Sequence, residues 1–239
     1  MSKFWLVARL SPVVLFIALS PFAAAQTSQA SSPKDAGDVL FAQGAFIEAI
    51  DAYNRAPADA ATLNKIGVAW HHLSSVDEAR KNYERALSLQ PDFPEALSNL
   101  GSTYFVEKNY RQAQHLYERA FALNPKSAII AANLGSVYFA QEKYEQGLEA
   151  YRTAFNLDPA SLDFDLTRMI EGPSSRRIRL RRDYSLSEIF ASENLDDRAI
   201  DFLRRAMGEG FHDWKRVMHD PAFAELRDTP QFAQLMLGS

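Results

Sequence analysis

The chain has 239 residues, of which 47% are hydrophobic and 23% are charged, and its formal net charge at pH 7 is −4. This composition is typical of a folded protein, and the acidic balance argues against a surface made for nucleic acid. The chain contains no cysteine, which excludes a disulfide framework, a thiolate metal site and a cysteine nucleophile.

The first 25 residues have a composition of their own. Two basic residues precede an apolar stretch from Leu10 to Leu19, and Ala23 and Ala25 fit the small-residue pattern of a signal-peptide cleavage site. The alternative is a transmembrane anchor, but the stretch is short for ~30 Å of hydrocarbon. We therefore expect cleavage after Ala25, a flexible leader over 26–33, and a periplasmic or secreted protein without a membrane span.

Three blocks of 34 residues follow one another without a gap, at 60–93, 94–127 and 128–161. In all three, glycine occupies the eighth position, tyrosine the twenty-fourth, alanine the twenty-seventh and proline the thirty-second. The eighth position shares one helix face with the seventh and eleventh, and the twenty-fourth shares a second helix face with the twentieth and twenty-seventh. Small residues allow the two helices to approach closely, and the proline ends the second one. Each block therefore predicts a helical hairpin that buries its apolar face against the next.

These blocks resemble tetratricopeptide repeats (TPR) in length, in their small residues and in the closing proline. The resemblance implies an all-α fold, a right-handed α-solenoid. Residues 34–59 fit the same pattern less well, because Pro57 arrives early, and we interpret them as a degenerate first repeat.

The register breaks after residue 161. Gly172-Pro173 and five arginines predict an irregular basic linker over 162–181. Helical spacing returns over 182–239, which we interpret as a fourth TPR-like hairpin with a C-terminal cap. The pairs Asp220-Pro221 and Thr229-Pro230 predict two short helices, which would cover the last exposed apolar face of the array.

In TPR proteins the first helices of successive repeats line a concave groove, and the resemblance implies that positions two, five, nine, twelve and thirteen face it. We take positions five, nine and twelve as the candidate binding residues. In the three full repeats, these positions are held by Asn64, Val68, His71, Ser98, Ser102, Phe105, Ala132, Ser136 and Phe139. Such a groove would be mildly apolar and suited to an extended or helical peptide. The alternative for Phe105 and Phe139 is that they pack between repeats.

The sequence shows no catalytic constellation. Its five histidines lack the spacing of a metal site, and the P-loop and nucleophile-elbow motifs are absent. We therefore expect no enzyme activity, no cofactor and no metal. The basic run leaves two interpretations: Arg176, Arg177 and Arg179 contact an anionic partner, or they begin a solvated helix and pair with nearby acids.

The expected function is therefore that of a scaffold or adaptor, which binds a protein or peptide partner in the groove. An alternative role is a structural or accessory subunit of a cell-envelope complex, in which the array captures no peptide.

Overall fold

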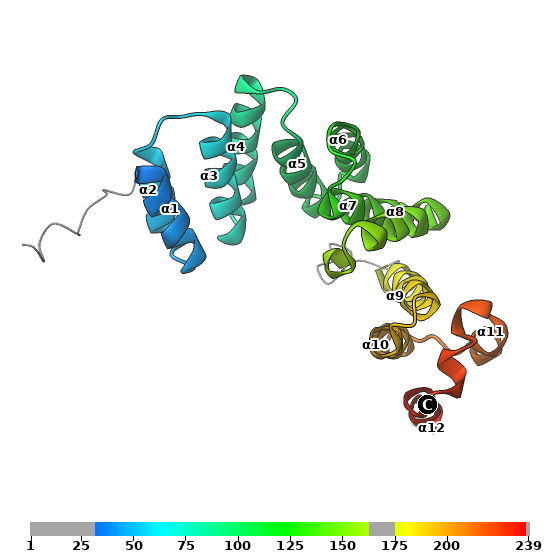
Figure 1. Ribbon diagram of the computed structural model, residues 1–239. Coiled ribbons are helices and arrows are strands. Elements are labelled where there is room, and N and C mark those ends of the chain that lie inside the picture. The colour runs from blue at the N-terminus through cyan, green and yellow to red at the C-terminus, as the bar shows by residue number, and fades with distance from the viewer. Residues whose placement is uncertain (1–31, 163–174, 238–239) are drawn as a thin grey trace, which may run out of the picture.

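The computed structural model describes residues 32–162 and 175–237 (Figure 1). The predicted signal peptide and most of the predicted leader lie outside these residues. Within the described residues every regular element is a helix, and no helix is both long and apolar enough to cross a membrane. The helices follow one another along an arch, as the all-α solenoid prediction requires, and that prediction is confirmed.

Helical hairpins make up most of the described chain. They are α1 (Pro33–Ala42) with α2 (Phe46–Asn54), α3 (Ala60–His72) with α4 (Val76–Leu89), α5 (Pro94–Val106) with α6 (Tyr110–Leu123), α7 (Ala128–Ala140) with α8 (Tyr144–Leu157), and α9 (Ser175–Ser192) with α10 (Asp196–Gly208). In the hairpins α5–α6 and α7–α8, the first helix lies toward the inner side of the arch and the second toward the outer side (Figure 1).

The first hairpin begins earlier than expected. Ser32 caps α1: its hydroxyl accepts a hydrogen bond from the Asp35 backbone N–H at 3.2 Å, and the Asp35 carboxylate accepts one from the Ser32 N–H at 3.0 Å. This reciprocal capping starts the helix at Pro33, whose fixed φ suits a first helical position. The predicted leader over 26–33 is therefore wrong at Pro33, which belongs to α1.

The turn inside each hairpin passes through one residue in the left-handed conformation. These residues are Gly44 (φ 77°), Ser74 (59°), Lys108 (63°), Glu142 (61°) and Asn194 (56°). A residue of this conformation ends a helix by allowing the next N–H groups to reach back to its last carbonyls. Gly44 adopts it without steric cost, whereas a residue with a Cβ is strained there.

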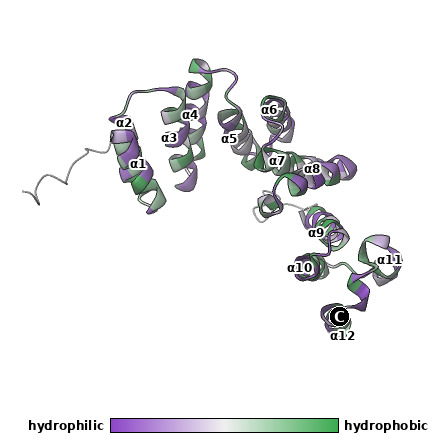
Figure 2. Ribbon diagram, in the orientation of Figure 1, coloured by the Kyte–Doolittle hydropathy of each residue, from purple (hydrophilic) through white to green (hydrophobic). Residues whose placement is uncertain are grey.

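The largest part of the core is continuous from the second full repeat to the end of the described residues. One cluster of buried residues extends from Phe105 on α5 to Leu235 on the last described helix. Three smaller clusters lie nearer the N-terminus, and one of them reaches Ile130 on α7. Ten of the thirteen residues of α7 are buried, and Figure 2 shows it hydrophobic around most of its surface. A helix of this kind has neighbours on most sides, so α7 joins the regular repeats to the C-terminal part of the chain.

The predicted linker over 162–181 is wrong from Ser175 onward, because α9 begins there. Arginine and leucine favour helix, and Ile178 is buried within this stretch. Arg182 and Asp183 form an ion pair at 2.5 Å, with each side chain only 3% exposed. The basic run is therefore the first half of a packed helix.

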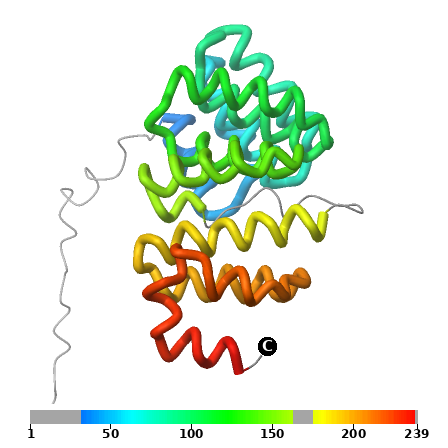
Figure 3. Tube along the Cα trace, turned by 90° about the vertical axis from the view of Figure 1, so that its right-hand side faces the viewer, coloured from blue at the N-terminus to red at the C-terminus, as the bar shows by residue number. Residues whose placement is uncertain are grey.

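Four further helices form the C-terminal cap, which we define as residues Phe211–Leu237. They are α11 (Trp214–His219), η4 (Pro221–Phe223), η5 (Leu226–Asp228) and α12 (Pro230–Leu237). Asp220 and Thr229 cap η4 and α12, since their side chains accept hydrogen bonds from the backbone N–H groups of Ala222 and Phe232. Of the two predicted short helices, the first is η4, which is a single 3-10 turn. Below the α7–α8 hairpin, α9, α10 and α12 lie in successive layers (Figure 3).

Candidate binding groove

Side-chain hydrogen bonds join neighbouring first helices along the inner face of the arch. Asn99 donates from Nδ2 to Oδ1 of Asn64 at 2.9 Å, and Asn133 donates from Nδ2 to Oγ of Ser98 at 3.2 Å. Both bonds run from the sixth position of one repeat to the fifth position of the repeat before it. The predicted groove residues Asn64 and Ser98 therefore help to fix how successive repeats stack.

The predicted groove serines at position nine bond within their own hairpins. Ser102 Oγ lies 3.0 Å from the hydroxyl of Tyr117, and Ser136 Oγ lies 3.2 Å from that of Tyr151. Burial raises the pKa of Tyr151 to about 12, so its hydroxyl stays protonated and needs such a partner. Ser98, Ala132 and Ser136 are themselves buried. These positions support the groove from beneath instead of presenting free groups to a ligand.

Phe105 and Phe139 do not line the groove, because their exposed fractions are 2% and 0%. The ring of Phe139 stacks on Tyr151 at 5.2 Å between centroids, and Phe105 contacts Tyr110 at the same distance. Both phenylalanines lie one helical turn after the close-approach glycine at position eight, so they point toward the second helix of the hairpin. The interpretation of the two phenylalanines as groove anchors is therefore wrong. Their spacing of four residues from the glycine could have indicated in the sequence that they are buried.

Val68 is different from the serines at its repeat position, and it lines a cavity. The cavity has a volume of about 180 Å³ and lies between the first two hairpins. Its lining consists of Asp38, Phe41, Tyr53, Lys65 and Val68. We call it the N-terminal pocket. Apart from Val68, its lining was missed in the sequence, although Asp38 occupies position nine of the degenerate repeat and could have been aligned with Val68.

Charged side chains form the rim of the N-terminal pocket. Asp38 accepts hydrogen bonds from Lys65 Nζ at 2.6 Å and from the Tyr53 hydroxyl at 2.7 Å. Burial opposes ionisation of Asp38, but these hydrogen bonds outweigh it and lower its pKa. Burial and the neighbouring Asp38 raise the pKa of Tyr53. At neutral pH the rim therefore carries one carboxylate, one ammonium and a neutral phenol.

Aromatic neighbours hold the apolar wall in place. Phe41 contacts the Phe46 ring at 5.2 Å between centroids, and His72 stacks on Phe46 at 4.7 Å with an interplanar angle of 16°. His71, the predicted groove residue beside it, is half-buried, and burial lowers its pKa, so it is neutral at pH 7. The wall is thus packed and largely preformed.

The three arginines predicted to contact an anion have partners within the chain. Arg176 Nε donates to the backbone oxygen of Glu209 at 2.7 Å, and Arg179 pairs with the carboxylate of Glu209 at 2.6 Å. Arg177 pairs with Glu142 in the turn between α7 and α8. Of the two interpretations left open, this geometry favours pairing with acids of the chain, although these acids are distant in sequence. The pairs attach α9 to the turn between α7 and α8 and to the C-terminal end of α10.

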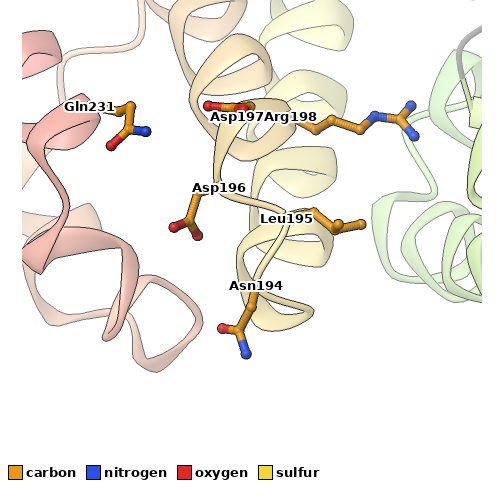
Figure 4. Close-up of a pocket in the computed structure, with 6 residues that line it drawn as sticks. All are labelled: Asn194, Leu195, Asp196, Asp197, Arg198 and Gln231. Atoms are coloured by element: carbon orange, nitrogen blue, oxygen red, sulfur yellow. The ribbon is translucent and has the colours of Figure 1, made fainter.

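A second depression, of about 420 Å³, lies where α10 begins. Its lining consists of Asn194, Leu195, Asp196, Asp197, Arg198 and Gln231. Figure 4 shows Leu195 and Arg198 pointing to the opposite side from Gln231, and Arg198 lies 4.1 Å above the Phe190 ring. The side chains do not converge on one point, so we do not take this depression as a ligand site. Within residues 32–162 and 175–237, no group of three or more side chains suits a metal ion.

Comparisons with known proteins support the repeat interpretation. The family described as anaphase-promoting complex, cyclosome, subunit 3 matches residues 72–154, which is less than half of the chain. No curated protein sequence matches. Among solved structures, PilF of Pseudomonas aeruginosa is 16% identical with a TM-score of 0.55, and the match covers 86% of this chain and 88% of that one. A thermophilic TPR protein of Thermus thermophilus is 19% identical with a TM-score of 0.52, covering 86% and 97%. The chain has a tetratricopeptide repeat fold.

A third TPR-like structure extends the likeness. MamA is 24% identical with a TM-score of 0.50, and the match covers 77% of this chain and 98% of MamA. The TPR fold in general supports a scaffold for protein–protein interaction, while the choice of partner depends on the individual groove. In this TPR array, the N-terminal pocket is a cavity lined by residues of α1, α2 and α3.

Proposed function

We propose that the chain is a non-catalytic adaptor that binds a segment of a partner protein along the inner face of α1, α3, α5 and α7. An aliphatic or aromatic side chain of that segment occupies the N-terminal pocket. The observation that carries the proposal is this cavity, placed where Val68 replaces the serine of the later repeats. A cavity of about 150 Å³ accommodates benzene, so 180 Å³ suits one phenyl or leucyl group.

Polar groups that join α3 and α5 suit a peptide backbone. Asn99 gives only one of its two amide protons to Asn64, so the pair keeps donors and acceptors for main-chain groups of a bound segment. Lys65 and Asp38 satisfy each other at the rim, which leaves the pocket itself apolar. This combination, an apolar anchor site beside paired polar groups, is typical of interfaces in which a few anchors supply most of the affinity.

We further propose that the adaptor works outside the cytoplasm, on the basis of the signal-peptide features of residues 1–25. The partner would then be another exported protein. The alternative, a structural subunit that captures no peptide, predicts that the pocket can be filled without any effect on partner binding.

The test is selection of short random peptides on the immobilised protein, followed by affinity measurement on variants. Val68→Lys places a long charged side chain in the pocket. The control Glu84→Lys makes a larger charge change than Val68→Lys, at an exposed position of helix α4. Since burial of one apolar side chain contributes about 1.5–3 kcal/mol, we expect Val68→Lys to weaken selected peptides at least about tenfold, and Glu84→Lys to leave them unchanged.

Two results would count against the proposal. If the selected peptides share no aliphatic or aromatic residue, the pocket is not an anchor site. If they bind Val68→Lys as tightly as the unmodified chain, the groove is not where they bind. Circular dichroism of both variants verifies that the comparison is made between folded proteins.

A further inference from the structure

Two carboxyl groups meet where the C-terminal cap contacts the fourth hairpin. Glu188 lies on α9, and Asp220 lies at the junction between α11 and η4. The two side chains hydrogen-bond to each other. A hydrogen bond between two carboxyl groups requires a proton on one of them, so this contact exists only while the pair holds one.

The surroundings decide which carboxyl keeps the proton. Asp220 accepts hydrogen bonds from the Tyr184 hydroxyl at 3.1 Å and from the Ala222 N–H at 3.0 Å, which favour its charged form. Glu188 is 14% exposed and has the Arg216 guanidinium at 3.3 Å. Burial, followed by the contact with Asp220, raises the pKa of Glu188 to about 7. Below neutral pH, Glu188 therefore carries the proton and donates it to Asp220.

The charged groups of α11 and η5 lie at the Glu188–Asp220 pair, whereas those at the C-terminal part of α10 lie near Asp183. Arg216 of α11 faces Glu188 and lies 4.3 Å above the Tyr184 ring, and Arg227 donates to the backbone oxygen of Asp220 at 2.9 Å. Arg205 of α10 and Glu209 after it influence the pKa of Asp183 instead. Tyr151 of α8 interacts with the Arg182–Asp183 pair. Arg216 thus contacts Glu188 directly, and its charge also favours the ionised form of Asp220.

The same junction holds the cap on the array. Asp220 caps η4, and the backbone around it is bound by Arg227. Behind it, Val217, Phe223 and Leu226 each have an exposed fraction of 0%. The Tyr184 ring packs between Phe211 at 4.8 Å and Phe223 at 5.8 Å. Any repulsion between Glu188 and Asp220 therefore acts on the contact that covers this apolar surface.

We propose that the C-terminal cap is a pH-sensitive cover of the array, closed while Glu188 and Asp220 share one proton and loosened when both are ionised. Below neutral pH, the cap seals the end of the solenoid. Above neutral pH, two like charges face each other, and the cap opens more often. Opening exposes Val217, Phe223 and Leu226 together with the α9 surface beneath them. The inference does not depend on the proposed peptide binding.

The test is hydrogen exchange of the unmodified chain at pH 5.5 and pH 8.5, read by mass spectrometry on peptides from α11 and η4. Each rate is divided by the rate of the same peptide in the unfolded chain at the same pH, which removes the intrinsic pH dependence. Opening of the cap returns Glu188 to its ordinary pKa. The closed state therefore loses stability as pH rises through the raised pKa, and we expect cap protection to fall about tenfold or more between the two pH values. Peptides from α5 and α6 supply the internal reference.

Three variants separate the mechanism from a general loss of stability. Glu188→Gln keeps a neutral hydrogen-bond donor toward Asp220, and we expect high protection that does not change with pH. Asp220→Asn removes the second charge, and we expect a smaller fall of protection with pH than in the unmodified chain, because burial still raises the pKa of Glu188. Glu193→Gln, at an exposed position beyond α9, should reproduce the drop of the unmodified chain. A constant protection in the unmodified chain, or an equal drop in Glu188→Gln, overturns the proposal.

Discussion

The ring of Tyr83 lies against the backbone of Gly67, so closely that a Cβ on this glycine would come within 2.5 Å of the ring's Cε1 atom. Tyr83 is 1% exposed and cannot swing away. Gly101 has the same relation to Tyr117, with a corresponding distance of 2.8 Å. The glycine at position eight and the tyrosine at position twenty-four therefore form one contact, repeated along the array.

Replacing this glycine should be costly. We expect Gly67→Ala to lower the free energy of unfolding by about 1–3 kcal/mol, because the added methyl overpacks a closed contact. Gly208→Ala is the matched control, since nothing lies within 4 Å of the position of its Cβ and alanine favours helix. Urea unfolding of both variants measures the difference. Equal stability for the two would contradict the close-contact explanation.

The burial of Phe139 leads to a second prediction. Phe139→Ala should destabilise the protein by about 3–5 kcal/mol, as truncation of a buried aromatic residue does. Ile129→Ala, on the same helix and 67% exposed, should change stability by less than about 0.5 kcal/mol. Thermal unfolding by circular dichroism tests both. A small effect at Phe139 together with weaker peptide binding would restore the original groove interpretation.

The left-handed turn residues allow a stabilising change. Lys108 has a φ of 63°, and Lys108→Gly should raise the free energy of unfolding by about 0.5–1 kcal/mol, because glycine adopts this conformation without steric cost. The reverse change, Gly44→Ala at φ 77°, should destabilise. Chemical denaturation provides the comparison, and a loss of stability in Lys108→Gly would show that the side chain matters more than the backbone.

The rim of the N-terminal pocket has a defined pH dependence. Because the pKa of Asp38 is lower in the folded chain than its ordinary value of 3.8, its ionised form stabilises the fold above that value. This contribution disappears as pH falls through the lowered pKa. We expect Asp38→Asn to be less stable than the unmodified chain at pH 7 and equal to it at the acid end. Stability curves against pH for the two proteins check this, and a constant difference would exclude ionisation as its cause.

The N-terminal region can be tested without structural data. Expression of the full chain in a bacterium, followed by fractionation and N-terminal sequencing, should find a periplasmic or secreted product that begins at Gln26. An alanine-to-arginine change at Ala25 should block this processing, because the cleavage site requires small residues. A product that retains Met1 would contradict export with cleavage.

The sequence was most informative where the repeat is regular. Glycine, tyrosine and proline recur at fixed positions, and each has a local physical reason, so the hairpins from α3 to α8 follow from spacing alone. It was least informative where a side chain's role depends on the neighbouring repeat. The bond from Asn99 to Asn64 and the pocket shared by Asp38 and Val68 both join residues of different hairpins. Such contacts depend on how repeats stack, which a single sequence does not specify.

The basic run illustrates a different limit. Its charge pattern could not distinguish a surface for an anionic partner from a helix whose charges are satisfied internally. The answer depended on Glu142 and Glu209, which lie far from Arg177 and Arg179 in sequence and beside them in space. Charge runs of this kind are interpretable only once their long-range partners are known.

The division of the core has a consequence for how the molecule unfolds. The cluster that extends from Phe105 to Leu235 ties the later hairpins and the cap into one cooperative unit, whereas α1 and α2 rest on a small cluster that they share with α3. The first hairpin should therefore open locally well before the rest of the chain. A ligand that contacts both Phe41 and Val68 would hold that hairpin against α3, so binding and local folding at this end of the array are thermodynamically linked.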